Sequence, residues 1–273
     1  MNRRTGLLLA LLAVLLLLWC ISDKPNRSEL VATNSSLADP ERHDAVADYS
    51  TEQLDIDQAD KTYLFIGNSH THSHDLANRV LSLLKFHYPQ EKCAVQTVSV
   101  GFIDEAARDP AVNKKLRDHQ WTGVILQAQP ISSSGRFNHS TAEGIDLAKR
   151  AKTTGAATFF FSEWGLQNVA DSTARTDRIY RQMSEASGAL HIPVGLVWEK
   201  VLQDSPNLPL YDFDGNHQSA LGADLTALVI ACSLCNTPPT SFRSYIPKTA
   251  SQEQWSVWLA SYQALLDKTA AIP

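Results

Sequence analysis

The sequence predicts an α/β protein, a three-layer α/β/α sandwich built on a five-stranded parallel sheet. From residue 61 onward, short apolar runs of the β type alternate with longer segments of helical periodicity. Parallel strands need helical crossovers of this kind between them, with helices covering both faces of the sheet. The chain has 273 residues and 44% hydrophobic content, which is enough to bury a full core.

The expected elements follow one another in regular order. Strands are expected at residues 62–67 ("TYLFIG"), 94–100 ("AVQTVSV"), 123–127 ("GVILQ"), 157–162 ("ATFFFS") and 192–197 ("IPVGLV"). Helices are expected at residues 75–88, 104–119, 140–154, 171–190 and 217–234. Over residues 251–269 the large apolar side chains recur at helical spacing, which predicts a last helix packed on the domain.

The N-terminal residues indicate export. Residues 1–22 are expected to form a signal peptide or an N-terminal membrane anchor, because Arg3 and Arg4 precede an apolar run that is short for a bilayer span. Residues 23–60 are polar and lack periodicity, as expected for a linker, and the domain is placed at residues 61–273. The protein is therefore expected in the periplasm or outside the cell, attached to the membrane if the segment is not cleaved.

The composition limits the classes of partner that the protein is expected to bind. A net charge of -5 leaves no basic surplus to neutralise phosphates, so a nucleic acid is not expected as a partner.

Cys232 and Cys235 in "CSLC" can pair with each other or with Cys93, whereas zinc would need ligands that no second CxxC supplies. Small buried thiols fit the same pattern equally well.

The chemistry is expected at the carboxyl ends of the strands, where open parallel sheets bind ligands. Ser69 follows the first strand in a Gly-Asn-Ser turn, which exposes its hydroxyl. Asp214 stands three residues before His217 in "DGNH", where a carboxylate can orient the histidine as a general base for a hydroxyl. Asp212 competes for the orienting role.

These motifs resemble a known family. "IGNSHT" is similar to the first block of the SGNH (GDSL) hydrolases, with Asn68 where the commonest members carry aspartate, and "DGNH" is similar to their last block. Gly101 matches the second-block glycine. The third block departs from the pattern, since "ILQAQP" has Gln127 at the glycine position and Gln129 at the asparagine position. "LFIGNSHT", "VGLVWEKV" and "LYDFDGNHQSALGADLTALVI" together resemble a bacterial branch of this superfamily.

The resemblance implies a flavodoxin-like sheet and hydrolysis of an ester, often an acetyl ester on a carbohydrate or a lipid, through an acyl-enzyme on Ser69. It gives His217 the role of base and Asp214 that of its orienting acid. The oxyanion would be held by the backbone N–H groups of Ser69 and Gly101 and by the Gln129 amide. No metal or organic cofactor is needed. A degenerate domain that binds a cell-surface polysaccharide, or an O-acyltransferase, would use the same residues.

The remaining candidates lie around this site. His70, Gln127, Glu163 and Trp164 adjoin strand ends and are predicted to bind the substrate. The alternation of His70 with two further histidines also permits a metal site, which would need more ligands from elsewhere. The further histidines of that alternative are His72 and His74, with His119 and His139 as the possible additional ligands. The serine interpretation is preferred, because a helix would not place all three histidines of the run on one face.

Overall fold

The computed structural model describes residues 55–128, 130–131 and 137–270 of the chain. Its centre is a five-stranded parallel sheet in the order β2-β1-β3-β4-β5, which confirms the predicted parallel sheet and its flavodoxin-like arrangement. The strands are β1 (Lys61–Gly67), β2 (Cys93–Ser99), β3 (Gly123–Leu126), β4 (Ala157–Phe161) and β5 (Leu190–Ile192).

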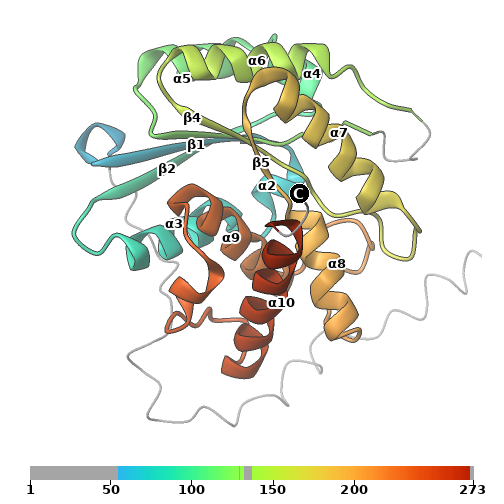
Figure 1. The fold of residues 1–273 in the computed structure, drawn as a ribbon. Helices are drawn as coiled ribbons and strands as arrows, with labels where there is room; N and C mark the ends of the chain where they lie inside the picture. The colour runs from blue at the N-terminus through green and yellow to red at the C-terminus, as the bar shows by residue number, and fades with distance from the viewer. Residues whose placement is uncertain (1–54, 129, 132–136, 271–273) are drawn as a thin grey trace, which may run out of the picture. The chain divides into compact units, whose positions relative to one another are not determined.

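Two helical layers cover the sheet (Figure 1). One layer contains α4 (Ile103–Ala106), α5 (Pro110–Asp118), α6 (Ala142–Thr153) and α7 (Ser172–Ser187). The other contains α3 (Leu76–His87), α8 (Val194–Asp204), α9 (Ala220–Cys235) and α10 (Gln252–Ala270). Short helices complete the chain at η1 (Ile56–Gln58), α2 (Ser69–His72), η2 (Ser73–Asp75) and η3 (Pro239–Phe242).

The alternation of side chains along β1 produces two separate cores. Tyr63 and Phe65 point into the core shared with α3, α8, α9 and α10, whereas Leu64 and Ile66 point into the core shared with α4 to α7. The predicted C-terminal helix is confirmed as α10, which packs on the first of these cores through Trp255. The inner strands β1, β3 and β4 are buried over most of their lengths and read as mostly apolar runs, whereas the edge strand β2 has exposed residues at Thr97 and Ser99.

The fifth strand was predicted in the wrong place. The apolar run at 192–197 was expected to be a strand, but β5 ends at Ile192 and helix α8 begins at Val194, just after Pro193. Val194, Val197 and Trp198 recur at helical spacing and are all buried, so the helical periodicity prevailed over the short apolar run. Trp198, expected to follow a strand, therefore lies inside a helix.

The single helix expected over residues 104–119 is two helices. Pro110 lacks a backbone N–H and restricts the residue before it, so α4 ends at Ala106 and α5 begins at Pro110. The Asp109 side chain caps the new helix by accepting a hydrogen bond from Ala111 N at 2.6 Å.

Residues 1–54, which include the predicted signal or anchor and most of the predicted linker, lie outside the described residues. The described part of the linker contains η1, and its Ile56 is buried in the core shared with α4 to α7. Among the described helices, none is long and apolar enough to cross a membrane.

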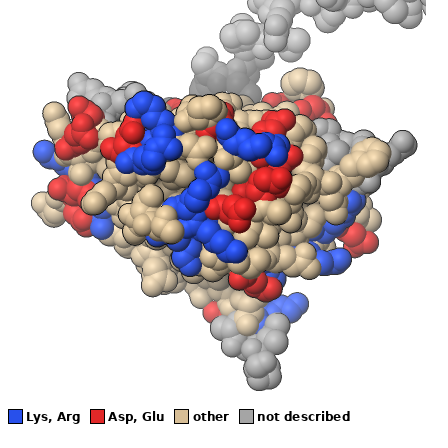
Figure 2. Space-filling model, turned by 90° about the horizontal axis from the view of Figure 1, so that it is seen from above, with Lys and Arg blue, Asp and Glu red and all other residues tan. Residues whose placement is uncertain are grey.

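None of the cysteines in the described part of the chain forms a disulfide. Cys93, Cys232 and Cys235 are free thiols, and the first two are buried, in agreement with the buried-thiol alternative rather than with a disulfide. Burial raises the pKa of the Cys93 thiol to about 11. Figure 2 shows basic and acidic side chains interspersed on the face that it views from above. Arg108 Nη1 lies 3.5 Å from Glu143 Oε1.

Candidate functional site

The first part of the site is a turn at the carboxyl end of β1, the nucleophile turn (residues 67–71). Helix α2 begins at Ser69, and the Asn68 side chain caps it by accepting a hydrogen bond from His70 N at 3.0 Å. The Asn68 carbonyl accepts from Thr71 N at 3.0 Å. Ser69 is exposed, as the sequence predicted, and its backbone N–H has no acceptor within this short helix.

The second part is the acid–base loop (residues 211–219), between α8 and α9. His217 Nδ1 lies 2.5 Å from Asp214 Oδ2, and His217 Nε2 lies 2.8 Å from Ser69 Oγ. A carboxylate only accepts, so Nδ1 carries the proton and donates to Asp214, which leaves Nε2 to accept from the Ser69 hydroxyl. The structure thus brings together the three residues predicted as a triad.

Local bonds hold the aspartate of this loop. Asp214 Oδ1 accepts hydrogen bonds from Asn216 N and His217 N, each at 2.9 Å. The bond from the His217 side chain, followed by those from the two backbone N–H groups, lowers the pKa of Asp214 to about 2. Asp212, the competing acid, instead accepts from Phe213 N and lies 3.9 Å from His74. Asp214 is therefore the carboxylate that contacts His217.

The structure describes two of the three expected oxyanion donors, Ser69 and Gly101. In the sheet, Gly67 pairs with Ser99, so Gly101, two residues beyond Ser99, follows the end of β2 as Ser69 follows the end of β1. Gly101 is exposed, and a Cβ atom there would lie 2.4 Å from Glu105 Oε2, so a larger residue would displace that side chain. Gln129, the third expected donor, lies outside the described residues.

Gln127 lies beneath the nucleophile turn and not in an open pocket. Its side chain is fully buried, and its Oε1 accepts from Asn68 N at 3.2 Å and from Thr71 Oγ1 at 2.7 Å. Its Nε2 donates to Glu163 Oε2 at 3.3 Å. A Cβ at Gly67 would lie 2.8 Å from Gln127 Oε1, so the turn depends on a glycine there.

The other predicted substrate contacts are buried as well. Glu163 is 4% exposed, and burial raises the pKa of its carboxyl to about 7, although Tyr180 and Gln127 hydrogen-bond to it. Trp164 is buried against Trp198. His70 is 3% exposed.

The prediction that His70, Gln127, Glu163 and Trp164 bind substrate is therefore corrected. These side chains form the support under and behind the triad, and their atoms contact protein groups. The positions after the strand ends were identified correctly, but sequence spacing does not show whether a side chain faces outward or inward.

The other histidines point to separate partners. His72 Nε2 donates to Gly67 O at 3.1 Å, and His74 lies near Asp212. His119 lies 3.3 Å from Asp57, and His139 stacks on Phe102. Among the described residues, no three His, Cys, Asp or Glu side chains are arranged to hold a metal ion.

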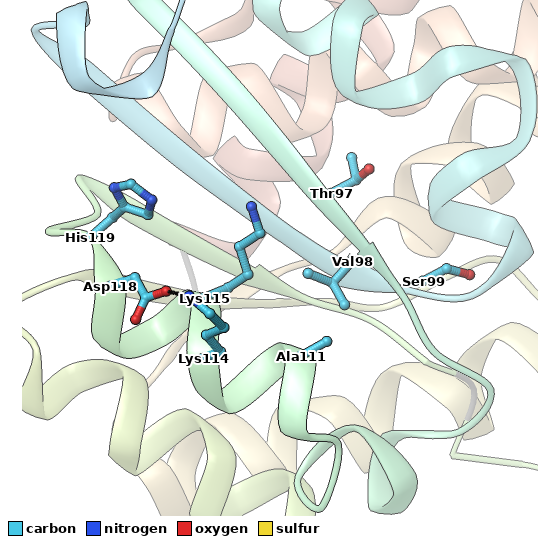
Figure 3. A pocket seen from close by; sticks show the side chains of 8 residues that line it. All are labelled: Thr97, Val98, Ser99, Ala111, Lys114, Lys115, Asp118 and His119. Carbon is cyan, nitrogen blue, oxygen red and sulfur yellow. Dashed lines mark hydrogen bonds and ion pairs between the residues drawn. The ribbon is translucent and has the colours of Figure 1, made fainter.

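A surface pocket of about 570 Å³ lies away from the triad, between β2 and α5 (Figure 3). Thr97 and Ser99 line it from the strand, and Lys115 and His119 belong to its opposite side. The Lys115 amine is hydrogen-bonded to the Gln96 side chain. None of the lining residues belongs to the triad, so this pocket is distinct from the candidate active site.

Solved structures share the fold of this chain. A DUF4886 family protein from Bacteroides uniformis has a TM-score of 0.55 at 12% identity, over 78% of this chain and 97% of that one. A protein from Slackia heliotrinireducens, classed provisionally as an SGNH hydrolase, has 0.51 at 23% identity, over 63% and 97%. A catalytic mutant of Axe2, an acetylxylan esterase from Geobacillus stearothermophilus, has 0.51 at 13% identity, over 65% and 94%.

These likenesses show that the chain has the fold of the SGNH hydrolases, the fold that its sequence motifs predicted. No family model matches the sequence, and no curated protein matches it. At such low identities the likeness concerns the fold alone, and activity has to be argued from the geometry of the site.

Proposed function

We propose that the protein is a serine esterase that hydrolyses an ester through an acyl-enzyme on Ser69. The observation that carries this proposal is the chain of hydrogen bonds from Ser69 Oγ through His217 to Asp214, at the carboxyl edge of an SGNH-type sheet. Nucleophile and base lie within hydrogen-bond reach, and a third group orients the base, which is the arrangement that activates a serine hydroxyl.

In the first half of the reaction, Ser69 Oγ attacks the ester carbonyl while His217 Nε2 takes the hydroxyl proton. Negative charge develops on the carbonyl oxygen, where the N–H groups of Ser69 and Gly101 and the amide of Gln129 are the proposed donors. The tetrahedral intermediate collapses when His217 delivers its proton to the leaving alcohol. The product is an acyl group on Ser69 and a free alcohol.

In the second half, a water molecule attacks the acyl-enzyme and His217 accepts its proton. Collapse of the second intermediate returns the proton to Ser69 Oγ and releases the carboxylic acid. Asp214 remains ionised throughout, because its low pKa keeps it a carboxylate that stabilises the His217 imidazolium. The cycle uses groups of the protein and water only.

We propose an acetyl or similar short acyl group on a carbohydrate as the substrate class. Two observations support this class. One structural neighbour is an acetylxylan esterase. The triad is also partly exposed, with 29% of the His217 side chain and 34% of the Asp214 side chain open to solvent, which suits a bulky alcohol outside the site. The N-terminal residues support action outside the cytoplasm, with the membrane as partner if the segment stays attached.

The test uses the full chain with p-nitrophenyl acetate and a fluorophosphonate probe. Wild type is expected to hydrolyse the ester and to be labelled, whereas Ser69→Ala does neither. Ser256→Ala, which removes an exposed hydroxyl on α10, is the matched control and should behave as wild type. Equal behaviour of wild type and Ser69→Ala would refute the proposal. Acetylated xylo-oligosaccharides offered with an acceptor sugar separate hydrolysis, which releases acetate, from transfer, which acetylates the acceptor.

A further inference from the structure

Four rings form a column behind the triad. Trp198 and Trp164 are stacked with their centroids 4.0 Å apart and their planes 5° apart. The ring centroids of Trp164 and His70 lie 5.2 Å apart, with their planes tilted by 49°. The ring centroids of His70 and His217 lie 5.0 Å apart, with 29° between the two imidazole planes. The column runs from a fully buried tryptophan to the partly exposed histidine of the triad, so His217 rests against the hydrophobic core through His70.

Hydrogen bonds fix the two tryptophans of the column. Trp198 Nε1 donates to Thr226 Oγ1 on α9 at 3.1 Å. Trp164 Nε1 donates at 2.8 Å to the carbonyl of Asn216, the residue before His217. A buried indole N–H needs such a partner, and here the partner is the backbone of the acid–base loop itself.

His70 is tied to the same loop through its backbone and its ring. Gln218, the residue after His217, donates from Nε2 to His70 O at 3.1 Å and to Ser73 O at 3.0 Å. Asn216 also lies close enough to the His70 ring to raise its pKa, against the effect of burial. The two imidazoles are thus carried by segments that are bonded to each other, which fixes their relative position.

The hydrogen bonds of His217 do not by themselves determine the tilt of its ring. They act at Nδ1 and Nε2, in the plane of the imidazole, and leave rotation about the line between these atoms free. With 29% of its side chain exposed, His217 is not confined by burial. The flat face of His70 supplies the third constraint.

His70 can take this place because it stays uncharged. Burial, followed by the nearby charge of His217, lowers the pKa of His70 to about 4, while Asp214 acts in the opposite direction. A neutral ring face tolerates a cation beside it, so the His217 imidazolium can form next to His70 without repulsion. His70 Nδ1 is buried and without a partner among the described residues, so it does not draw the ring elsewhere.

We propose that His70 is a positioning residue, whose ring holds the imidazole of His217 in line between Asp214 and Ser69. This inference rests on the proposed esterase function. Removing a stacked aromatic partner is expected to shift the equilibrium between an aligned and a tilted His217 ring about tenfold toward the tilted ring. His70→Ala is therefore expected to lower kcat for p-nitrophenyl acetate about tenfold, with KM within about twofold of wild type.

The experiment compares His70→Ala, His70→Phe and the matched control His119→Ala in the full chain. His70→Phe keeps a flat neutral ring and should recover most of the kcat. His119→Ala also removes an imidazole that contacts a tryptophan, Trp121 at 5.5 Å, but away from the triad, and should keep wild-type kcat. Each variant is assayed below its own Tm. The low-field proton resonance of His217 Nδ1–H should broaden in His70→Ala and persist in His70→Phe.

The outcomes separate the two proposals. If wild type is neither active nor labelled by fluorophosphonate, the proposed function fails. If wild type is active and folded His70→Ala keeps its kcat and its low-field resonance, the positioning role is wrong. It is equally wrong if folded His70→Phe is as slow as His70→Ala, since the ring face would then not be what matters.

Discussion

The two parts of the site are held in different ways. The nucleophile turn rests on buried polar groups, because the Gln127 amide connects Asn68 N and Thr71 Oγ1 above it to Glu163 below. The acid–base loop is partly exposed and is held by its own tight turn and by the stacked ring of His70. Buried hydrogen bonds are costly to break singly, whereas stacking is weaker and tolerates other flat rings. The support under the turn should therefore depend on chemical identity, and the ring contact behind the loop should depend on shape.

The largest expected effect concerns the loop. Asp214→Asn keeps the shape of the side chain but cannot stabilise the imidazolium of His217, and the same change in other Ser-His-Asp triads lowers kcat by about 10⁴. A comparable loss is expected in the steady-state kcat of ester hydrolysis.

The matched control for this change is Asp212→Asn. This neighbouring carboxylate accepts from Phe213 N and does not contact His217, so its loss should change kcat by less than about threefold. Similar losses in the two variants would contradict the assignment of Asp214 as the orienting acid.

The contribution of Glu163, which lies beneath the nucleophile turn, to the free energy of unfolding should fall as the pH rises. The pKa of Glu163 is about 7 in the folded state and 4.5 as the ordinary value, so the folded state holds its proton more tightly. Its contribution is fully present below pH 4.5 and is lost as the pH rises through 7, by about 3 kcal/mol in the free energy of unfolding. Urea unfolding between pH 4.5 and 8.5 should show this slope in wild type and not in Glu163→Gln. Parallel profiles for the two proteins would contradict it.

The contribution of His70, the ring behind the loop, to the free energy of unfolding should change with pH in the opposite direction. The pKa of His70 falls from 6.5 to about 4 on folding, so the unfolded state takes up a proton first as the pH drops. The contribution is present above pH 6.5 and is lost as the pH falls through 4, again by about 3 kcal/mol. The difference in unfolding free energy between wild type and His70→Phe, measured from pH 7.5 to pH 3.5, isolates this slope. A difference that does not vary with pH would show that His70 titrates normally.

The smallest of these effects concerns Gln127 itself. Gln127→Met fills a similar volume but leaves Asn68 N–H without its acceptor, which should lower the free energy of unfolding by about 1–3 kcal/mol. Thermal unfolding would measure this loss. Gln96→Met, at the edge of the sheet, is the comparison and should cost about 0.5 kcal/mol or less. Equal losses would mean that the amide under the turn is not a specific support.

Much of the fold could be predicted because burial on both faces of a parallel sheet leaves short, nearly continuous apolar runs, which recur between segments of helical periodicity. The runs at β1 and β4 were identified as strands for this reason. The fifth strand was misplaced because the run at 192–197 is equally compatible with a helix of spacing i, i+3, i+4, and only the packing of Val197 and Trp198 decides between them.

The sequence by itself indicated the residues on which the proposed chemistry of the site rests. A serine after a Gly-Asn turn and an Asp-x-x-His pair are local patterns, since the turn and the three-residue spacing already bring Asp214 to His217. Tertiary structure alone decided which side chains face the solvent and which lie beneath. His70 adjoins Ser69 in the chain but turns inward, and Gln127 and Glu163 meet only because β3 and β4 are neighbours. Burial depends on what packs against a residue from elsewhere in the chain, and sequence spacing carries no record of that.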